Sequence, residues 1–296
     1  SFFLCRKRFT KPTGLRPCCP GFLKRSIAIP LALLSIFGLI YVRIDTVMLS
    51  VMKGDAVVGW YNAAYNLVLG LKPFPQWFLN ALFPLTSTLF ISSKASLKFT
   101  YEKAFKYLFT VGLPMAVGIM MLASRFILLF YGQAFENSII ALQILSWDAL
   151  LIFMYWPLAF MLVSMDKQKK MAVGAGISAL LNVVLNLLLI PRFSYTGAAI
   201  ATIVTEAVLF GMYFYLVSKY LTRIPLHKMI ISPLIACAVM AVFIHFCTGI
   251  NLAALVIVAG VIYFVVLYLA KGISPEDIKL LKQVVRPPKS RKDIKP

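Results

Sequence analysis

The chain has 296 residues, of which 61% are hydrophobic and 14% are charged, and its mean hydropathy is +0.87. These values exclude a soluble globular domain and predict an all-α fold, a polytopic transmembrane helix bundle. The net charge of +20 would suit a nucleic-acid partner, but the basic residues cluster between apolar segments. This distribution indicates membrane topology instead, so we expect no nucleic acid as a partner.

Apolar runs long enough to cross a bilayer recur eight times along the chain. A transmembrane helix needs about 20 mostly apolar residues. Runs that meet this criterion span residues 27–51, 57–92, 107–131, 138–164, 171–191, 196–218, 229–248 and 251–270. The second run is too long for one straight helix, and Pro73, Pro75 and Pro84 predict that it is kinked.

The basic residues give these spans a direction. With eight crossings, 25 of the 30 Lys and Arg fall on one side. The positive-inside rule places that side, and both termini, in the cytoplasm. We therefore expect a multi-pass protein of the cytoplasmic membrane.

Four regions follow from this layout. We expect a cytoplasmic basic flank with the end of a preceding helix, a six-helix transporter lobe, an additional transmembrane hairpin, and a basic tail with a short interfacial helix capped by Ser274. Their bounds are residues 1–25, 26–219, 220–271 and 272–296, respectively.

Two opposite charges, Arg43 and Asp45, interrupt the first apolar run. An ionisable residue at membrane depth indicates a functional site by default. Positions i and i+2 of a helix point to different sides, so the two charges cannot neutralise each other well. Each is therefore expected to have a partner on another helix.

Three more ionisable residues lie inside spans: Lys72, Asp148 and Glu206. Their distances from the helix ends suggest that Asp45, Asp148 and Glu206 share one layer with Arg43. We interpret the three acids as an ion-coupling or charge network, and Arg43 and Lys72 as substrate-binding groups. The alternative is that all five form salt bridges between helices without touching a substrate.

Amide and aromatic side chains add a second set of candidates. Amides can hydrogen-bond sugar hydroxyls, and tyrosine rings can stack on sugar faces. The candidate substrate-binding amides are Gln76, Asn80, Asn182 and Asn186. The same groups could instead join helices, and for Tyr61, near the outer boundary, a position in the interfacial belt is the favoured interpretation.

Signatures of enzymes, metal sites and cofactor sites are missing from the sequence. It contains no Cys-x-x-Cys, His-Glu-x-x-His or Walker motif, and its five cysteines form no external pattern that predicts disulfides. The small residues at Gly174-x-Gly176 and Gly197–Ala199 predict close helix packing rather than a phosphate loop. We therefore expect no catalytic activity, no cofactor and no bound metal.

Several sequence blocks resemble the second half of oligosaccharide flippases, the polysaccharide-biosynthesis exporters of a superfamily that also contains multidrug and toxic compound extrusion proteins and the lipid II flippase. The specific blocks are Tyr41–Ser50, Val58–Tyr65 and Phe83–Leu85, and weaker ones are Pro191–Phe193, Gly197–Thr202 and Ser274–Asp277. The resemblance implies the second six-helix lobe plus the extra helix pair, without the first lobe.

The resemblance also implies a function: flipping a polyprenyl-diphosphate-linked oligosaccharide across the membrane by alternating access. It implies as partners a lipid-linked glycan substrate, membrane lipids, a first lobe missing from this chain, and polysaccharide assembly enzymes. Arg43 would contact the diphosphate, since its planar guanidinium suits phosphate oxygens. The alternatives are an ion-coupled small-molecule antiporter of the same superfamily and a half-transporter that does not act alone.

Overall fold

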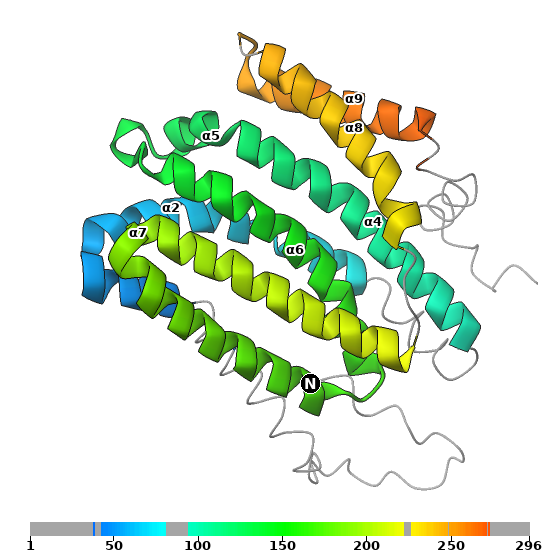
Figure 1. The fold of residues 1–296 in the computed structure, drawn as a ribbon. Helices are drawn as coiled ribbons and strands as arrows, with labels where there is room; N and C mark the ends of the chain where they lie inside the picture. The colour runs from blue at the N-terminus through cyan, green and yellow to red at the C-terminus, as the bar shows by residue number, and fades with distance from the viewer. Residues whose placement is uncertain are drawn as a thin grey trace, which may run out of the picture.

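The computed structural model describes residue 38 and residues 43–80, 94–221, 226–247, 249–270 and 272. The basic flank 1–25 and the interfacial helix expected from Ser274 lie outside these residues. The described part contains helices and no strand, which confirms the all-α bundle (Figure 1).

Helices follow one another through the described chain with short connections. Residues 43–53 and 73–80 are helical on either side of α2. The named elements are α2 (Asp55–Leu69), α4 (Lys94–Met121), α5 (Ala123–Phe130), the short 3₁₀ helix η1 (Gln133–Phe135), α6 (Ser138–Ser164), α7 (Gln168–Tyr220), α8 (Leu226–Phe246) and α9 (Leu252–Leu269).

Five of the described helices are long and apolar enough to cross a membrane, so the chain is a multi-pass membrane protein. The longest, α7, has 53 residues and contains a kink at Ser194, where φ is 55° and ψ is −135°. Its two arms run back alongside each other (Figure 1). They correspond to the two expected spans 171–191 and 196–218.

Two expected spans differ from the observed helices. The run 107–131 is not one helix, because α4 begins at Lys94 and the helix breaks at Leu122, where φ is −101° and ψ is 13°. The apolar run continues across this break, so hydropathy alone does not reveal it. The second run breaks at residues 70–72, immediately before Pro73, as its prolines predicted.

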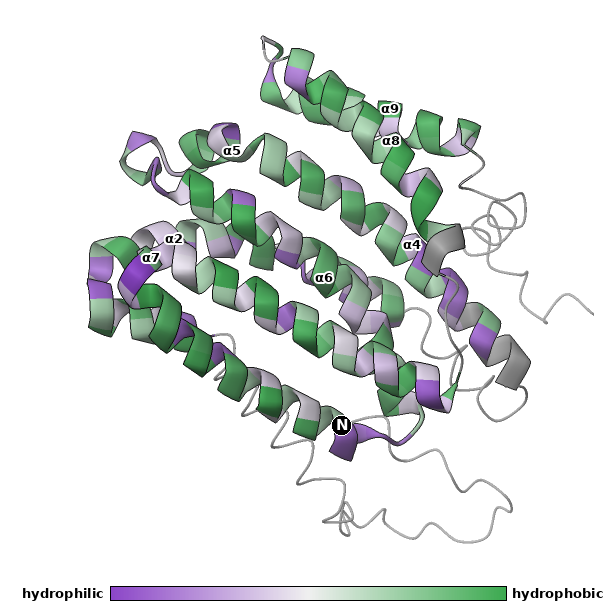
Figure 2. Ribbon diagram, in the orientation of Figure 1, coloured by the Kyte–Doolittle hydropathy of each residue, from purple (hydrophilic) through white to green (hydrophobic). Residues whose placement is uncertain are grey.

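Two hydrophobic clusters meet along α6. One joins α6 to α2 and α5, with Leu142, Leu145 and Ile152 fully buried. The other joins α4 and α6 to the hairpin of α8 and α9, with Leu158 and Tyr263 fully buried. Apolar residues cover most of every long helix (Figure 2), as expected where the bundle exterior contacts lipid.

Hydrogen bonds join the loops that were expected on the external side. The Lys53 ammonium donates to the Pro191 carbonyl at 3.0 Å, which links the connection at residue 54 to the kink of α7. Arg125 donates to the Ile250 carbonyl at 2.9 Å, which links α5 to the turn between α8 and α9. These contacts agree with alternating spans, while the side of the membrane stays a prediction.

Candidate functional site

The carboxylate of Asp45 lies at the centre of a buried polar cluster. Asp45 is only 2% exposed and accepts hydrogen bonds from three other helical segments. Tyr61 of α2 donates at 2.9 Å, Asn186 of the first arm of α7 donates at 2.5 Å, and Thr202 of the second arm donates at 2.8 Å. A buried carboxylate is tolerated in this way, because each bond offsets part of its desolvation.

The kink in α7 brings the two arms close enough to build this cluster. A Cβ added at Gly197 would lie 2.5 Å from the Leu189 carbonyl oxygen, so only glycine allows this approach. Ala198 and Ala199 follow and are fully buried. The small-residue block therefore packs the arms together, as its sequence predicted, and places Thr202 beside Asn186 across the hairpin.

The amide pair of α7 extends the cluster away from Asp45. Asn186 Nδ2 also donates to Asn182 Oδ1 at 3.0 Å, and both side chains are fully buried. Asn186 Oδ1 and Asn182 Nδ2 have no hydrogen-bond partner among the described residues. The cluster thus retains one buried acceptor and one buried donor in addition to the groups that hold Asp45.

Arg43 has surroundings opposite to those of Asp45, although one residue separates them. Its side chain is exposed, and no acidic side chain of the described residues lies within 4 Å of it. The two charges therefore do not form an ion pair with each other. Asp45 is satisfied by neutral groups, and the guanidinium is available to an anion.

Tyr65 connects Lys72 to the Asp45 cluster. It stacks on Tyr61 with ring centroids 5.5 Å apart, and the Lys72 ammonium lies 5.9 Å from its ring centroid. Because Tyr61 donates to Asp45, these contacts join Asp45 to Lys72 through two stacked rings.

Asp148 of α6 is buried in a different way from Asp45. Its side chain is 1% exposed, and neither carboxylate oxygen has a hydrogen-bond partner among the described residues. No basic side chain of the described residues lies within 4 Å of it. Glu206, on the second arm of α7, is 2% exposed.

Sequence reasoning misjudged one member of the cluster and missed another. Tyr61 was assigned to the interfacial belt, but it is fully buried and bonded to Asp45. Thr202 was not considered, since a threonine within a span carries no signal that separates a cluster member from a helix-packing residue. Gln76 and Asn80 are exposed and make no hydrogen bond within the described chain, so they stand apart from the cluster.

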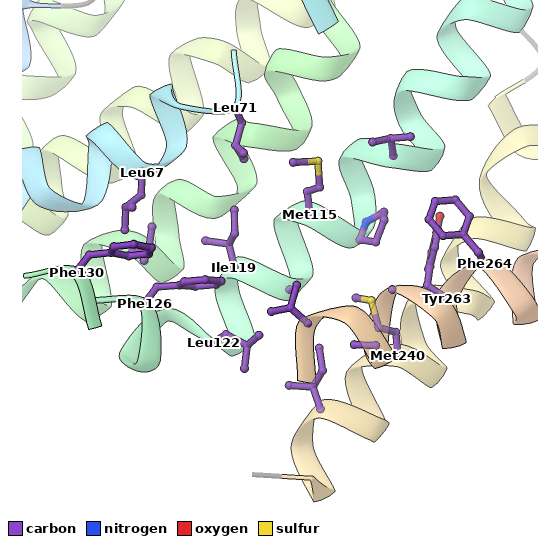
Figure 3. A pocket seen from close by; sticks show the side chains of 18 residues that line it. Leu67, Leu71, Met115, Ile119, Leu122, Phe126, Phe130, Met240, Tyr263 and Phe264 are labelled. Carbon is purple, nitrogen blue, oxygen red and sulfur yellow. The ribbon is translucent and has the colours of Figure 1, made fainter. Parts of the chain in front are cut away.

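An apolar groove of about 410 Å³ lies between helices α2, α4, α5 and α6 and the hairpin of α8 and α9 (Figure 3). Leu67, Met115, Ile119 and the stacked rings of Phe126 and Phe130 form the side opposite the hairpin. The hairpin side is formed by side chains of α8 and α9, which are Met240, Ile244, Val256, Ala259, Gly260, Tyr263 and Phe264. Its lining suits a hydrocarbon chain rather than a polar ligand.

Comparison with known proteins relates this architecture to a family. A family model described as polysaccharide biosynthesis protein matches residues 4–90. An uncharacterized membrane protein of Methanocaldococcus jannaschii is 25% identical over 232 residues, which are 77% of this chain and 46% of that protein. The probable low-salt glycan biosynthesis flippase Agl15 of Haloferax volcanii is 25% identical over 177 residues, which are 59% of this chain and 37% of that flippase.

Among solved structures, the lipid II flippase MurJ in an inward closed conformation matches with a TM-score of 0.67 at 14% identity. The match covers 85% of this chain and 53% of MurJ, so it shows a shared fold for about half of that protein. The chain spans about half or less of each relative. Together the comparisons confirm the resemblance to polysaccharide-biosynthesis flippases that the motifs indicated.

Proposed function

We propose that this chain is the second lobe of a flippase, not an enzyme, which moves a polyprenyl-diphosphate-linked oligosaccharide across the cytoplasmic membrane by alternating access, for cell-surface polysaccharide biosynthesis. A first lobe completes the central cavity, and polysaccharide assembly enzymes supply and use the glycan. Support comes from the family match, from the flippase among the relatives, and from the shared fold.

The separation of Arg43 from Asp45 carries the proposal. Asp45 is satisfied by Tyr61, Asn186 and Thr202, and no other acidic side chain of the described residues lies within 4 Å of Arg43. An exposed guanidinium at membrane depth is costly unless an anion meets it. The two phosphates of a lipid diphosphate provide that anion and match the planar fork of the guanidinium.

The buried acids supply the coupling. Asp45, Asp148 and Glu206 are close to fully buried, and a proton or a sodium ion bound there would change the charge of the lobe interior as the two lobes rock. Around Asp45, the hydroxyl of Thr202 and the amide oxygens of Asn182 and Asn186 are the hard ligands that a sodium ion uses.

The apolar groove offers a place for the lipid part of the substrate. It lies beside α2 and α4 and is lined by aliphatic and aromatic side chains, so a polyprenyl chain can lie against the lobe while the head group is in the cavity. Lys72, Gln76, Asn80, Asn182 and Asn186 stay candidate contacts to the head group.

A glycan-export assay in a flippase-deficient strain tests this function. The chain is produced joined to a matching first lobe, and Arg43→Lys and Arg43→Ala are scored for membrane abundance and for export. We expect normal abundance in both variants, strongly reduced export for Arg43→Lys, and none for Arg43→Ala, because an ammonium cannot make the bidentate contacts.

Arg192→Ala serves as the matched control, since Arg192 is exposed in the kink of α7 and carries no proposed contact. Normal export by Arg43→Ala would reject the diphosphate contact. Export of an organic cation that depends on the acids but not on Arg43 would favour the antiporter alternative instead. Complementation by residues 1–296 alone would mean that a second copy replaces the first lobe.

A further inference from the structure

Basic side chains converge on one tyrosine at the end of the bundle opposite to the kink of α7. The Lys167 ammonium lies 4.8 Å and the Lys170 ammonium 4.5 Å from the ring centroid of Tyr220, and Lys170 also donates to the Tyr220 hydroxyl. Lys219, which directly precedes Tyr220 in the sequence, lies 5.9 Å from the ring centroid of Tyr215. We call Lys167, Lys170, Lys219 and Tyr220 the basic end cluster.

Helix electrostatics explain only part of this arrangement. Lys219 lies in the last turn of α7 and Lys167 lies just beyond the end of α6, where the negative end of a helix dipole favours cations. Lys169 and Lys170, in contrast, lie in the first turn of α7, where the positive end of the dipole disfavours them. Lys167 and Lys170 also face the same ring, so their like charges repel each other at a local electrostatic cost.

No carboxylate in the described chain offsets that cost. Lys167, Lys170 and Lys219 have no acidic side chain within 4 Å, although Asp166 is adjacent in sequence. By contrast, Lys98 of α4, at the same end of the bundle, pairs with Glu102 at 3.9 Å. The basic end cluster thus lacks the counter-charge that the neighbouring helix provides for its own lysine.

The cluster stands on a turn that is fixed by hydrogen bonds. The Lys167 amide donates to the Leu162 carbonyl at 2.9 Å, and the Gln168 side chain donates to the Val163 carbonyl at 3.2 Å. Tyr220, the last residue of α7, provides the other side (Figure 2 shows hydrophilic residues at both ends of α7). The two ends of one helix hairpin are held together around the same ring.

We propose that the basic end cluster binds the phosphate head group of an acidic membrane lipid. It lies where both arms of a helix long and apolar enough to cross a membrane end, and clusters of Lys beside membrane spans attract acidic lipids. The phosphate takes the place of the missing carboxylate, and the positive end of the α7 dipole favours the same anion. This binding is independent of the proposed transport.

The test measures lipid preference in nanodiscs that hold the full chain. A spin-labelled phosphatidylglycerol and a spin-labelled phosphatidylcholine are compared by the fraction that each protein immobilises. We expect a preference for phosphatidylglycerol that falls about 25-fold in Lys167→Gln/Lys170→Gln, since each Lys near the surface contributes roughly fivefold. Lys167→Arg/Lys170→Arg should keep the preference.

The double variant Lys98→Gln/Lys103→Gln is the matched control. It removes the same charge from the same end, and Lys103 also lies over an aromatic ring, that of Phe99 at 5.4 Å. An unchanged preference in this control supports a specific site. An equal loss in both double variants would overturn the proposal in favour of general surface attraction. Displacement of the lipid by millimolar inorganic phosphate would overturn the lipid assignment in favour of a free phosphate.

Discussion

Two buried carboxylates of this bundle have opposite environments. Asp45 accepts hydrogen bonds from Tyr61, Asn186 and Thr202, whereas Asp148 accepts none from the described residues. Both are at most 2% exposed. Burial alone therefore does not define the role of an acid in a membrane bundle, because the donors around it decide whether its charge is stabilised or costly.

The difference gives Asp45 a structural role that Asp148 does not share. Asp45 holds four helical segments together, so its removal should damage the lobe. Asp148 adds nothing to stability that the structure shows, and its presence points to a task outside folding, such as binding a coupling ion.

The largest expected effect is that of Asp45→Leu. It leaves the hydroxyls of Tyr61 and Thr202 and the amide of Asn186 without their shared acceptor, which should lower the free energy of unfolding by about 3 kcal/mol. Chemical denaturation of the purified protein in detergent measures it. Asp55→Leu, at an exposed carboxylate bonded to Ser50, should cost less than about 0.5 kcal/mol. Equal losses in the two variants would refute the role of the cluster.

Closing the hairpin of α7 is a precondition for the Asp45 cluster but not for Asp148. Gly197→Ala puts a methyl group against the Leu189 carbonyl and should lower stability by about 2 kcal/mol. Gly211→Ala in the same arm meets no atom within 4 Å and should be neutral or slightly stabilising. A harmless Gly197→Ala would mean that the arms do not approach as closely as described.

A matched pair of tyrosines sharpens the comparison further. Tyr61→Phe removes a donor to a buried carboxylate and should cost about 1.5 kcal/mol. Tyr65→Phe removes a hydroxyl that has no hydrogen bond within the described chain and should cost less than about 0.5 kcal/mol. Thermal unfolding followed by tryptophan fluorescence compares the two. A larger loss for Tyr65→Phe would contradict the assignment of donors.

Asp148→Leu should change stability less than Asp45→Leu, Gly197→Ala or Tyr61→Phe, and in the opposite direction. Replacing a buried carboxylate that lacks donors with an apolar side chain of similar size should raise the free energy of unfolding by about 1 kcal/mol. In the protein joined to its first lobe, we expect the same variant to lose export. Destabilisation comparable to that of Asp45→Leu would show that Asp148 has partners in the fold.

The sequence predicted the parts of the fold that hydropathy controls. Span 138–164 coincides with α6, and the prolines after Lys72 mark a real break. The break at Leu122 was missed because apolar residues continue on both sides of it. Lipid contact and core contact look alike in a one-dimensional pattern, so helix ends inside the membrane are poorly defined by it.

The candidate site was predictable only in part, for a related reason. Charges such as Asp45 and Asp148 stand out within apolar runs, so they can be found without a structure. Thr202 and Tyr61 do not stand out, since both residue types are common in spans. Their role depends on contacts between residues far apart in the sequence: Tyr61 with Thr202 across 141 positions, and Thr202 with Asp45 across 157. The sequence likewise could not distinguish a satisfied Asp45 from an unsatisfied Asp148.

The central claim is that Arg43 and Asp45 act separately, Arg43 on a substrate and Asp45 within the lobe. A double-mutant cycle of Arg43→Leu and Asp45→Leu, followed by chemical denaturation in detergent, measures their coupling directly. We predict a coupling energy below about 0.5 kcal/mol, because the two side chains share no partner. A coupling above about 1.5 kcal/mol, with stability restored in the double variant, would show an ion pair and contradict the claim.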